Sequence, residues 1–97
     1  MKYKVVETSM FKKELKIIKK RRKSIQKLKE VINTLLKGLK GEKLEIKYRD
    51  HVLNNDKRFQ DCRECHIEPD LLLIYRIVEE ELILLLVEIG THSDLFK

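Results

Sequence analysis

The sequence predicts an α+β fold in which an N-terminal strand and a helical hairpin pack on a mostly antiparallel β-sheet. Three observations predict it. A short β-branched run opens the chain, two amphipathic stretches with helical spacing follow, and three strand-like runs with tight connections come last. The 97 residues are expected to form one domain, residues 1–97, because a chain of this length buries about 60–65% of its unfolded surface.

A first strand is predicted at residues 2–7, where β-branched and aromatic residues are concentrated. Thr8 and Ser9 can cap a helix that follows from Met10. Apolar positions in this helix are three and four residues apart, and lysines occupy the remaining arc. The lysines are Lys12, Lys13, Lys16, Lys19 and Lys20. This basic arc is either a solvated face or a contact for a polyanion such as nucleic acid, and it also suits the acidic residues of a protein partner.

A second, longer helix is predicted after the basic run 21–23, with Ser24 as its N-cap. Gly38 and Gly41 are expected to end it, because glycine adopts the left-handed conformation that closes helices. The gap between the two helices is short, so they are expected to form an antiparallel hairpin. The apolar stripe of the second helix is Ile25, Leu28, Val31, Ile32, Leu35, Leu36 and Leu39.

The middle of the chain, residues 42–61, is polar and is expected to be mostly loop. Residues 54–56 (Asn-Asn-Asp) form a turn signal, and a short extended piece is predicted at 44–48. This segment also contains Asp50 and His51.

Three further strands are predicted at residues 62–68, 71–78 and 82–89, joined by Pro69-Asp70 and by residues 79–81. The last strand is apolar without alternation, which is typical of a central strand covered on both faces. Gly90 is expected to end it.

The charge balance points to a polyanionic or acidic partner. The chain has 22 Lys and Arg against 16 Asp and Glu, a net charge of +6. The sequence contains neither a signal-peptide pattern nor an apolar run of about 18 residues, so a cytoplasmic protein without a membrane anchor is expected. In that compartment Cys62 and Cys65 are expected to be thiols.

A pattern of covalent haem attachment is matched by the run Cys62-Arg63-Glu64-Cys65-His66. Three functions suggested by this run can be rejected: haem attachment, a redox-active cysteine pair and a structural zinc site. Haem attachment belongs to exported proteins. A thioredoxin-like pair needs a helix N-terminus, whereas residues three apart on a strand point to opposite faces. A structural zinc site needs a second ligand pair at metal spacing. We therefore expect two incidental thiols, with Cys65 at least partly buried, and no metal or other cofactor.

The three histidines, His51, His66 and His92, are each expected at a loop or strand end and near an acid. Imidazole exchanges protons near neutral pH, and a nearby carboxylate orients it. A base, an acid and a cationic surface suffice for RNA cleavage by attack of the 2′-hydroxyl on its own phosphodiester. The histidines are therefore candidates for acid–base catalysis on RNA.

Four segments, residues 47–51, 63–70, 72–75 and 90–96, carry a resemblance to a known family. They read KYRDH, RECHIEPD, LLIY and GTHSDLF, and in this order they resemble the YafQ branch of the RelE-type toxins of bacterial toxin–antitoxin pairs. The resemblance covers the whole chain. It implies a microbial-ribonuclease-like fold, ribosome-dependent cleavage of messenger RNA, and neutralisation by a cognate antitoxin.

The resemblance also implies site residues. The catalytic positions correspond to His51, His66, Asp70 and His92, and the expected RNA contacts are Lys47, Arg49, Arg63 and Phe96.

We assign the roles as a hypothesis. His92 is the general acid, Asp70 or His51 is the general base, and His66 orients a partner or contacts phosphate. Arg63 and Lys47 are the candidates for stabilising transition-state charge.

The chain departs from the family pattern at three places. Glu88 stands about where an Arg is usual, and Leu71 replaces an aromatic. The loop between His51 and His66 is longer and lacks the usual glycines. Two alternatives remain open: a non-catalytic, ParE-like toxin that binds a protein target, and a plain RNA-binding module. The histidines argue against the first, and the few aromatic stacking positions argue against the second.

Overall fold

The computed structural model describes residues 3–37, 47–53 and 56–96. The first half of the chain contains β1 (Lys4–Glu7), α1 (Ser9–Ile18), α2 (Arg22–Leu36), β2 (His51–Val52) and the 3₁₀ turn η1 (Lys57–Phe59). The second half contains β3 (Arg63–Glu68), β4 (Leu71–Val78), the 3₁₀ turn η2 (Glu79–Glu81), β5 (Ile83–Gly90) and α4 (His92–Leu95).

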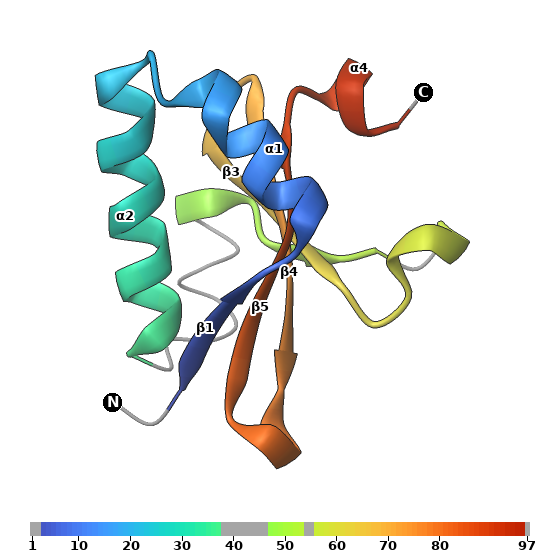
Figure 1. The fold of residues 1–97 in the computed structure, drawn as a ribbon. Helices are drawn as coiled ribbons and strands as arrows, with labels where there is room; N and C mark the ends of the chain where they lie inside the picture. Colours follow the sequence, from blue (N-terminus) through green and yellow to red (C-terminus); the bar gives the residue numbers. More distant parts are fainter. Residues whose placement is uncertain (1–2, 38–46, 54–55, 97) are drawn as a thin grey trace.

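The described strands form one five-stranded sheet with the order β1-β5-β4-β3-β2. β1 runs parallel to β5, and the other neighbouring pairs are antiparallel. In Figure 1, α1 and α2 lie on one side of the sheet, whereas η1 and α4 lie on the other. This confirms the predicted α+β fold with helices on a mostly antiparallel sheet.

The first helix forms as predicted. Thr8 is the N-cap, and its Oγ1 accepts a hydrogen bond of 3.0 Å from the Phe11 amide. Phe11 and Ile18 are buried against the sheet, and the five lysines of the basic arc are all exposed. The helical spacing of the apolar residues therefore decides which face of α1 packs.

The prediction that Ser24 caps the second helix is wrong. The helix begins at Arg22, after Arg21, whose side chain makes no capping hydrogen bond. Ser24 is 3% exposed, and its hydroxyl donates a 2.5 Å hydrogen bond to Glu68 Oε1 on β3. A tertiary partner thus takes the hydroxyl that a cap would use. The helix extends to Leu36. Leu39 and the predicted helix end at Gly38 and Gly41 lie outside the described residues.

The middle segment differs from the prediction of a loop with an extended piece at 44–48. Residues 44–46 lie outside the described part, and Lys47 and Tyr48 are helical rather than extended. Tyr48 is 8% exposed and belongs to the core, which fixes this turn against the sheet. The short strand β2 and the turn η1 were not predicted, because both are too brief to show a period.

The three strands after the middle segment are confirmed within one residue at each end. The last strand begins at Ile83 rather than Leu82, because Leu82 adopts a left-handed conformation (φ 52°) that closes η2. β5 does lie centrally, between β1 and β4. Its two faces are not equally covered, however: the positions facing the helices are buried, and Ile83, Leu85 and Val87 are only half-buried.

Apolar side chains gather on both faces of the sheet. The helix-side core includes Phe11, Val31, Leu73 and Leu86, each at most 1% exposed. Each such burial contributes about 1.5–3 kcal/mol relative to an exposed side chain. The opposite face carries a smaller group, called here the second cluster: Phe59, Cys62, Leu72, Ile74 and Leu95. The functional candidates border the second cluster.

Among the residues that the structure describes, no helix is both long and apolar enough to cross a membrane.

Candidate active site

The strand register brings distant segments into two rows across the sheet. In the first row His51 pairs with Glu64, Glu64 with Ile74, and Ile74 with Glu88. In the second row His66 pairs with Leu72, which pairs with Gly90. Residues opposite each other on neighbouring strands point to the same face, as do residues two apart on one strand.

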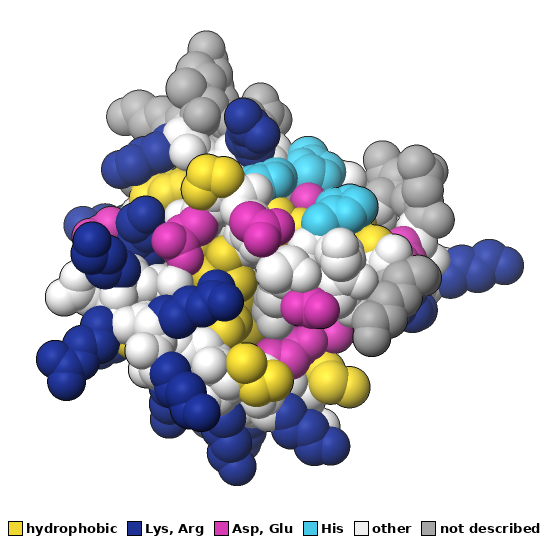
Figure 2. All heavy atoms as spheres, turned by 90° about the horizontal axis from the view of Figure 1, so that it is seen from above, with side chains coloured by type: hydrophobic (Ala, Val, Ile, Leu, Met, Phe, Trp, Pro, Cys, Tyr) yellow, Lys and Arg dark blue, Asp and Glu magenta, His cyan; other side chains and the backbone are white. Residues whose placement is uncertain are grey.

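These rows place His51, Glu64 and His66 on the face that carries the second cluster, since Leu72 and Ile74 belong to that cluster. His92 follows two residues after Gly90, at the same end of the sheet. Figure 2 shows histidine side chains gathered on one part of the surface beside Asp and Glu side chains, whereas most Lys and Arg side chains lie toward the left and lower edges of the view. The fold therefore brings together histidines that are far apart in the sequence.

His51 is exposed and is held at both ring nitrogens. Its Nδ1 lies 3.0 Å from the Arg49 carbonyl oxygen, and its Nε2 lies 3.4 Å from Glu64 Oε1. Both neighbours are acceptors, and a neutral imidazole has only one N–H to donate. These two contacts orient the His51 ring.

Glu64 was not singled out from the sequence. It is 4% exposed, and its Oε2 is buried without a hydrogen-bond partner among the described residues. A buried carboxylate of this kind is unusual unless it has a role, because burial without a partner is costly. The only advance signal was its place in the alternation of β3, two residues before His66.

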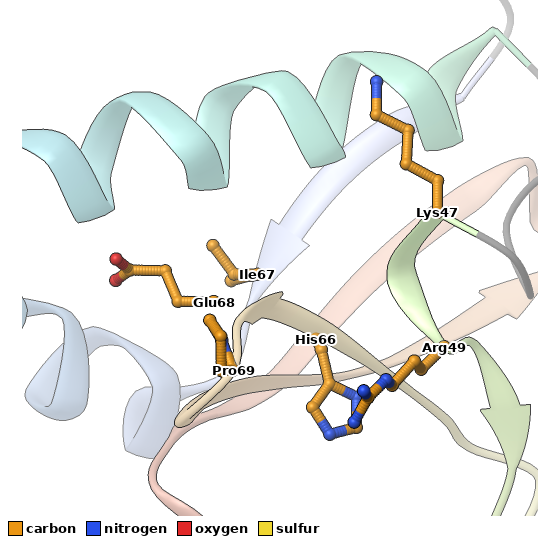
Figure 3. Close-up of a pocket in the computed structure, with 6 residues that line it drawn as sticks. All are labelled: Lys47, Arg49, His66, Ile67, Glu68 and Pro69. Carbon is orange, nitrogen blue, oxygen red and sulfur yellow. The ribbon is translucent and has the colours of Figure 1, made fainter.

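His66 is half-buried and lines a hollow of about 180 Å³ with Lys47, Arg49, Ile67, Glu68 and Pro69. Its Nδ1 is buried without a partner among the described residues. Figure 3 shows the Arg49 side chain on the same side of the hollow as the His66 ring, whereas Lys47 and Glu68 point away from that ring. The structure thus places Arg49 and His66 in the lining of one hollow, and the Lys47 Nζ atom lies 5.4 Å from the centroid of the Tyr48 ring.

Asp50, which the sequence indicated only as the acid beside His51, has a structural role that was not predicted. Its side chain is completely buried and accepts hydrogen bonds from Arg63 Nε (2.6 Å), Arg63 Nη2 (2.5 Å) and the Tyr75 hydroxyl. Burial and the neighbouring Asp50 carboxylate raise the pKa of Tyr75. Arg63 was predicted to contact RNA, but its Nε and Nη2 atoms both donate to Asp50, and its side chain is only 32% exposed.

Arg49 has a positive φ of 51°, which costs about 1–2 kcal/mol for a residue with a Cβ. The bonds of the adjacent Asp50 hold the backbone at this point and compensate for the strain. The result is that Arg49 and His51 both project from an anchored turn.

His92 begins the four-residue helix α4, capped by Thr91, whose Oγ1 accepts from the Asp94 amide at 3.2 Å. The His92 ring lies 4.9 Å from the Phe96 ring, centroid to centroid. Gly90 lies against α4, since a Cβ at this position would be 3.4 Å from Leu95 Cδ2, at van der Waals contact. His92 itself is exposed and able to reach a substrate.

Asp70 lies exposed in the two-residue turn between β3 and β4, at the end of the sheet that carries His66 and His92. Glu14 on α1 also reaches this end, where its carboxylate accepts a 2.9 Å hydrogen bond from the Ile89 amide. Burial, together with repulsion from Glu88 and Asp94, raises the pKa of Glu14 to about 7.

The two cysteines are free thiols that belong to opposite faces. Cys65 lies in the helix-side core and Cys62 in the second cluster, as the strand alternation predicted. Cys65 is 0% exposed, which confirms the expected burial.

Comparison with known proteins gives a consistent result. A family model described as the bacterial toxin of type II toxin–antitoxin systems, YafQ, matches residues 3–97. The mRNA interferase toxin YafQ of Escherichia coli (strain B / BL21-DE3) is 33% identical over 89 residues, covering 92% of this chain and 90% of that protein.

Two solved structures are similar over nearly the full length. In the crystal structure of the E. coli DinJ–YafQ complex, the matching chain has a TM-score of 0.79 and 30% identity, covering 98% of this chain and 99% of that chain. A metal-bound toxin from Helicobacter pylori has a TM-score of 0.83 and 37% identity, covering 97% and 99%. In the described part of the present chain, no three His, Cys, Asp or Glu side chains are grouped so as to hold a metal ion.

Proposed function

Because the chain belongs to the YafQ family of bacterial toxins of type II toxin–antitoxin systems, we propose that it cleaves messenger RNA in the decoding site of the ribosome. Its relatives are named mRNA interferase toxins, so the chemistry is that of an endoribonuclease. Such a protein acts in the cytoplasm, where translating ribosomes are found. The observation that carries the proposal is the sheet register that sets His51 and His66 on the face bordered by His92.

The reaction is an attack of the 2′-hydroxyl on the adjacent phosphorus. A base removes the hydroxyl proton, the O2′–P bond forms, the P–O5′ bond breaks, and an acid delivers a proton to the leaving 5′-oxygen. The products are a 2′,3′-cyclic phosphate and a free 5′-hydroxyl. All of this proceeds with side chains alone.

His92 is assigned as the acid, because it is exposed and its ring is steadied by Phe96. Asp70 is the better candidate for the base, since both ring nitrogens of His51 already face acceptors. His51, whose two ring nitrogens face the Arg49 carbonyl and Glu64, is then assigned to shaping the site beside the substrate rather than to proton transfer.

Stabilisation of the negative charge on the phosphorane is assigned to His66 and Arg49, which line the same hollow. Arg63 is assigned to holding Asp50, and Lys47 to a more distant backbone phosphate.

A cognate antitoxin is the proposed protein partner, as in the DinJ–YafQ complex of the E. coli relative. The net charge of +6 favours an acidic antitoxin, and the same charge favours the ribosome and its RNA as the target.

The test is a cleavage assay on a defined messenger with purified, antitoxin-free protein, with and without programmed ribosomes. We expect ribosome-dependent cuts that leave a 2′,3′-cyclic phosphate, and losses of about 10²- to 10⁴-fold in His92→Ala and Asp70→Asn. Ser93→Ala, an exposed neighbour on α4, is the matched control and should retain full activity.

Full activity in His92→Ala would overturn the assignment of the acid. If the folded wild-type protein cut no RNA on programmed ribosomes, a toxin that only binds a protein target would be the better explanation.

A further inference from the structure

α4 is too short to hold His92 in place by itself. It has four residues, a single helical turn, and isolated helices of that length are unstable in water. Its own contribution to anchoring is Leu95, which is 1% exposed within the second cluster. Something outside α4 must fix its orientation.

The turn η1 supplies that contact from 37 residues upstream. Arg58 Nη2 donates a 2.9 Å hydrogen bond to the Leu95 carbonyl oxygen, at the C-terminal end of α4. Carbonyls at helix C-termini have no partner within the helix and carry partial negative charge, so a guanidinium suits them.

Asp56 holds Arg58 in the orientation that reaches α4. Its carboxylate accepts from Arg58 Nε at 3.1 Å and from Nη2 at 2.8 Å, and it also accepts from the Arg58 amide at 3.0 Å. The Arg58 guanidinium holds the pKa of Asp56 below its ordinary value. Asp56 is therefore a negatively charged partner for Arg58 at neutral pH.

Contacts between aromatic rings also connect η1 to His92. Phe59, 2% exposed, packs edge-on against Phe96 at 5.9 Å with an interplanar angle of 76°. The Phe96 ring in turn lies 4.9 Å from the His92 ring. We call Asp56, Arg58 and Phe59 the η1 clasp.

We propose that the η1 clasp positions His92 for proton transfer, a role that rests on the function proposed above. A displacement of about 1 Å in a reacting group can reduce a rate by as much as 100-fold, so a device that fixes a short helix matters for the rate. The members of the η1 clasp are positioning residues, since they act through α4.

The rival explanation for Arg58 is a direct contact with RNA phosphate, because its side chain is 56% exposed. Charge decides between the two. If Arg58 acts only by its charge, Arg58→Ala weakens RNA binding and Asp56→Ala, which removes an anion, strengthens it. If the clasp holds α4, both variants reduce cleavage, and the double variant is no worse than either single one.

The experiment measures single-turnover cleavage at saturating ribosome, together with ribosome affinity, for Arg58→Ala, Asp56→Ala and the double variant. We expect a loss of about tenfold in the maximal rate for each, with little change in affinity for Asp56→Ala. Arg58→Lys should have an intermediate rate, because a lysine ammonium can contact Leu95 or Asp56 but lacks the several fixed donors of a guanidinium. The controls are Lys57→Ala and Glu80→Ala, exposed residues of matching charge outside the clasp, and both should keep wild-type rates.

A readout without activity separates failure of this proposal from failure of the proposed function. The proton shift of the His92 Hε1 atom reports its position relative to the Phe96 ring. We expect this NMR signal to move and broaden in both clasp variants while the melting transition stays cooperative. An unchanged His92 signal, or faster cleavage by Asp56→Ala, would overturn the proposal even if the wild-type enzyme cleaves as expected.

Discussion

Asp50 stands between two exposed residues, Arg49 and His51, yet its own carboxylate is completely buried. Through Arg63 on β3 and Tyr75 on β4 it fastens the segment that carries both neighbours to the sheet. Sequence reasoning treated Arg63 as free to contact RNA. The register and the burial of one aspartate show that two of its donors are already occupied.

Replacing Asp50 tests that anchor. Asp50→Ala leaves Arg63 and the buried Tyr75 hydroxyl without their acceptor, and the expected loss in the free energy of unfolding is about 3 kcal/mol. Urea denaturation measures it. Glu30→Ala, at an exposed position on α2, is the control, because a surface substitution of this kind is expected to change the free energy of unfolding by less than about 0.5 kcal/mol. Equal losses in the two variants would contradict a special role for Asp50.

Glu14 gives a prediction about pH. Burial, the largest cause, and repulsion from Glu88 and Asp94 raise its pKa to about 7 from an ordinary 4.5, so the folded state binds this proton more tightly than the unfolded state. Its contribution to stability is therefore complete below about pH 4.5 and is lost as the pH rises through 7. After allowance for solvent screening, the expected fall in unfolding free energy between these limits is about 1 kcal/mol.

Urea unfolding at several pH values checks this for Glu14→Gln, which can still accept from the Ile89 amide but does not titrate. This variant should lack the fall and be more stable than wild type above pH 7. Glu30→Gln, at an exposed position on α2, should keep the wild-type profile. A pH profile for Glu14→Gln that matched wild type would refute the assignment.

At the level of elements, α1 has two separate tasks. Its inner side bonds the backbone of β5 beyond the end of β1: Thr8 Oγ1 donates to the Val87 carbonyl at 2.6 Å, and Glu14 accepts from the Ile89 amide. These bonds fill part of a sheet edge that β1 leaves open. Its outer side presents the lysines of the basic arc to solvent, together with the exposed side chains of Met10 and Ile17. The inner bonds hold α1 in place for a polyanionic partner.

The basic arc predicts a change in salt dependence. Replacing Lys12, Lys16 and Lys19 with Gln should reduce the slope of log affinity for the ribosome against log salt by about 2 to 3, without removing the chemistry. Binding measured from low to moderate salt checks it. Lys4, Lys29 and Lys37, all exposed and outside α1, form the matched control triple. If both triples reduced the slope equally, net charge rather than this face would be responsible.

At the level of the whole molecule, the sheet separates the two thiols and buries both. Cys65 lies in the helix-side core, where burial raises its pKa, and Cys62 lies in the second cluster. Each thiol therefore requires opening of a different side of the molecule to react.

Thiol labelling consequently reports unfolding. For Cys62→Ser, in which Cys65 alone remains, the labelling rate at neutral pH should be negligible in buffer and should rise with urea in step with the loss of circular dichroism. Cys65→Ser serves as the comparison and should label earlier, because the second cluster is the smaller of the two. Rapid labelling of Cys65 in the native protein would show that the helix-side core opens locally.

Comparison of the elements shows which features of the fold can be predicted from the sequence. The spacing in α1 and the turn at Pro69-Asp70 predict local structure correctly, because they depend on neighbours within about five residues. Ser24 fails for the opposite reason: a serine before an apolar stripe is a good cap locally, but its hydroxyl is taken by Glu68 on β3. β2 and η1 are too short for any periodic signal, although they place His51 and hold α4.

The sequence by itself determined the α+β fold, the amphipathic faces of the helices, the opposed directions of the two cysteines and the four motifs that led to the family. Only the tertiary structure decided that Glu64 faces His51, that Asp50 occupies Arg63, and that η1 reaches α4. The physical reason is one of range. Helical and strand periodicities are written in adjacent residues, whereas register, burial and the choice of a hydrogen-bond partner depend on residues brought together by the fold.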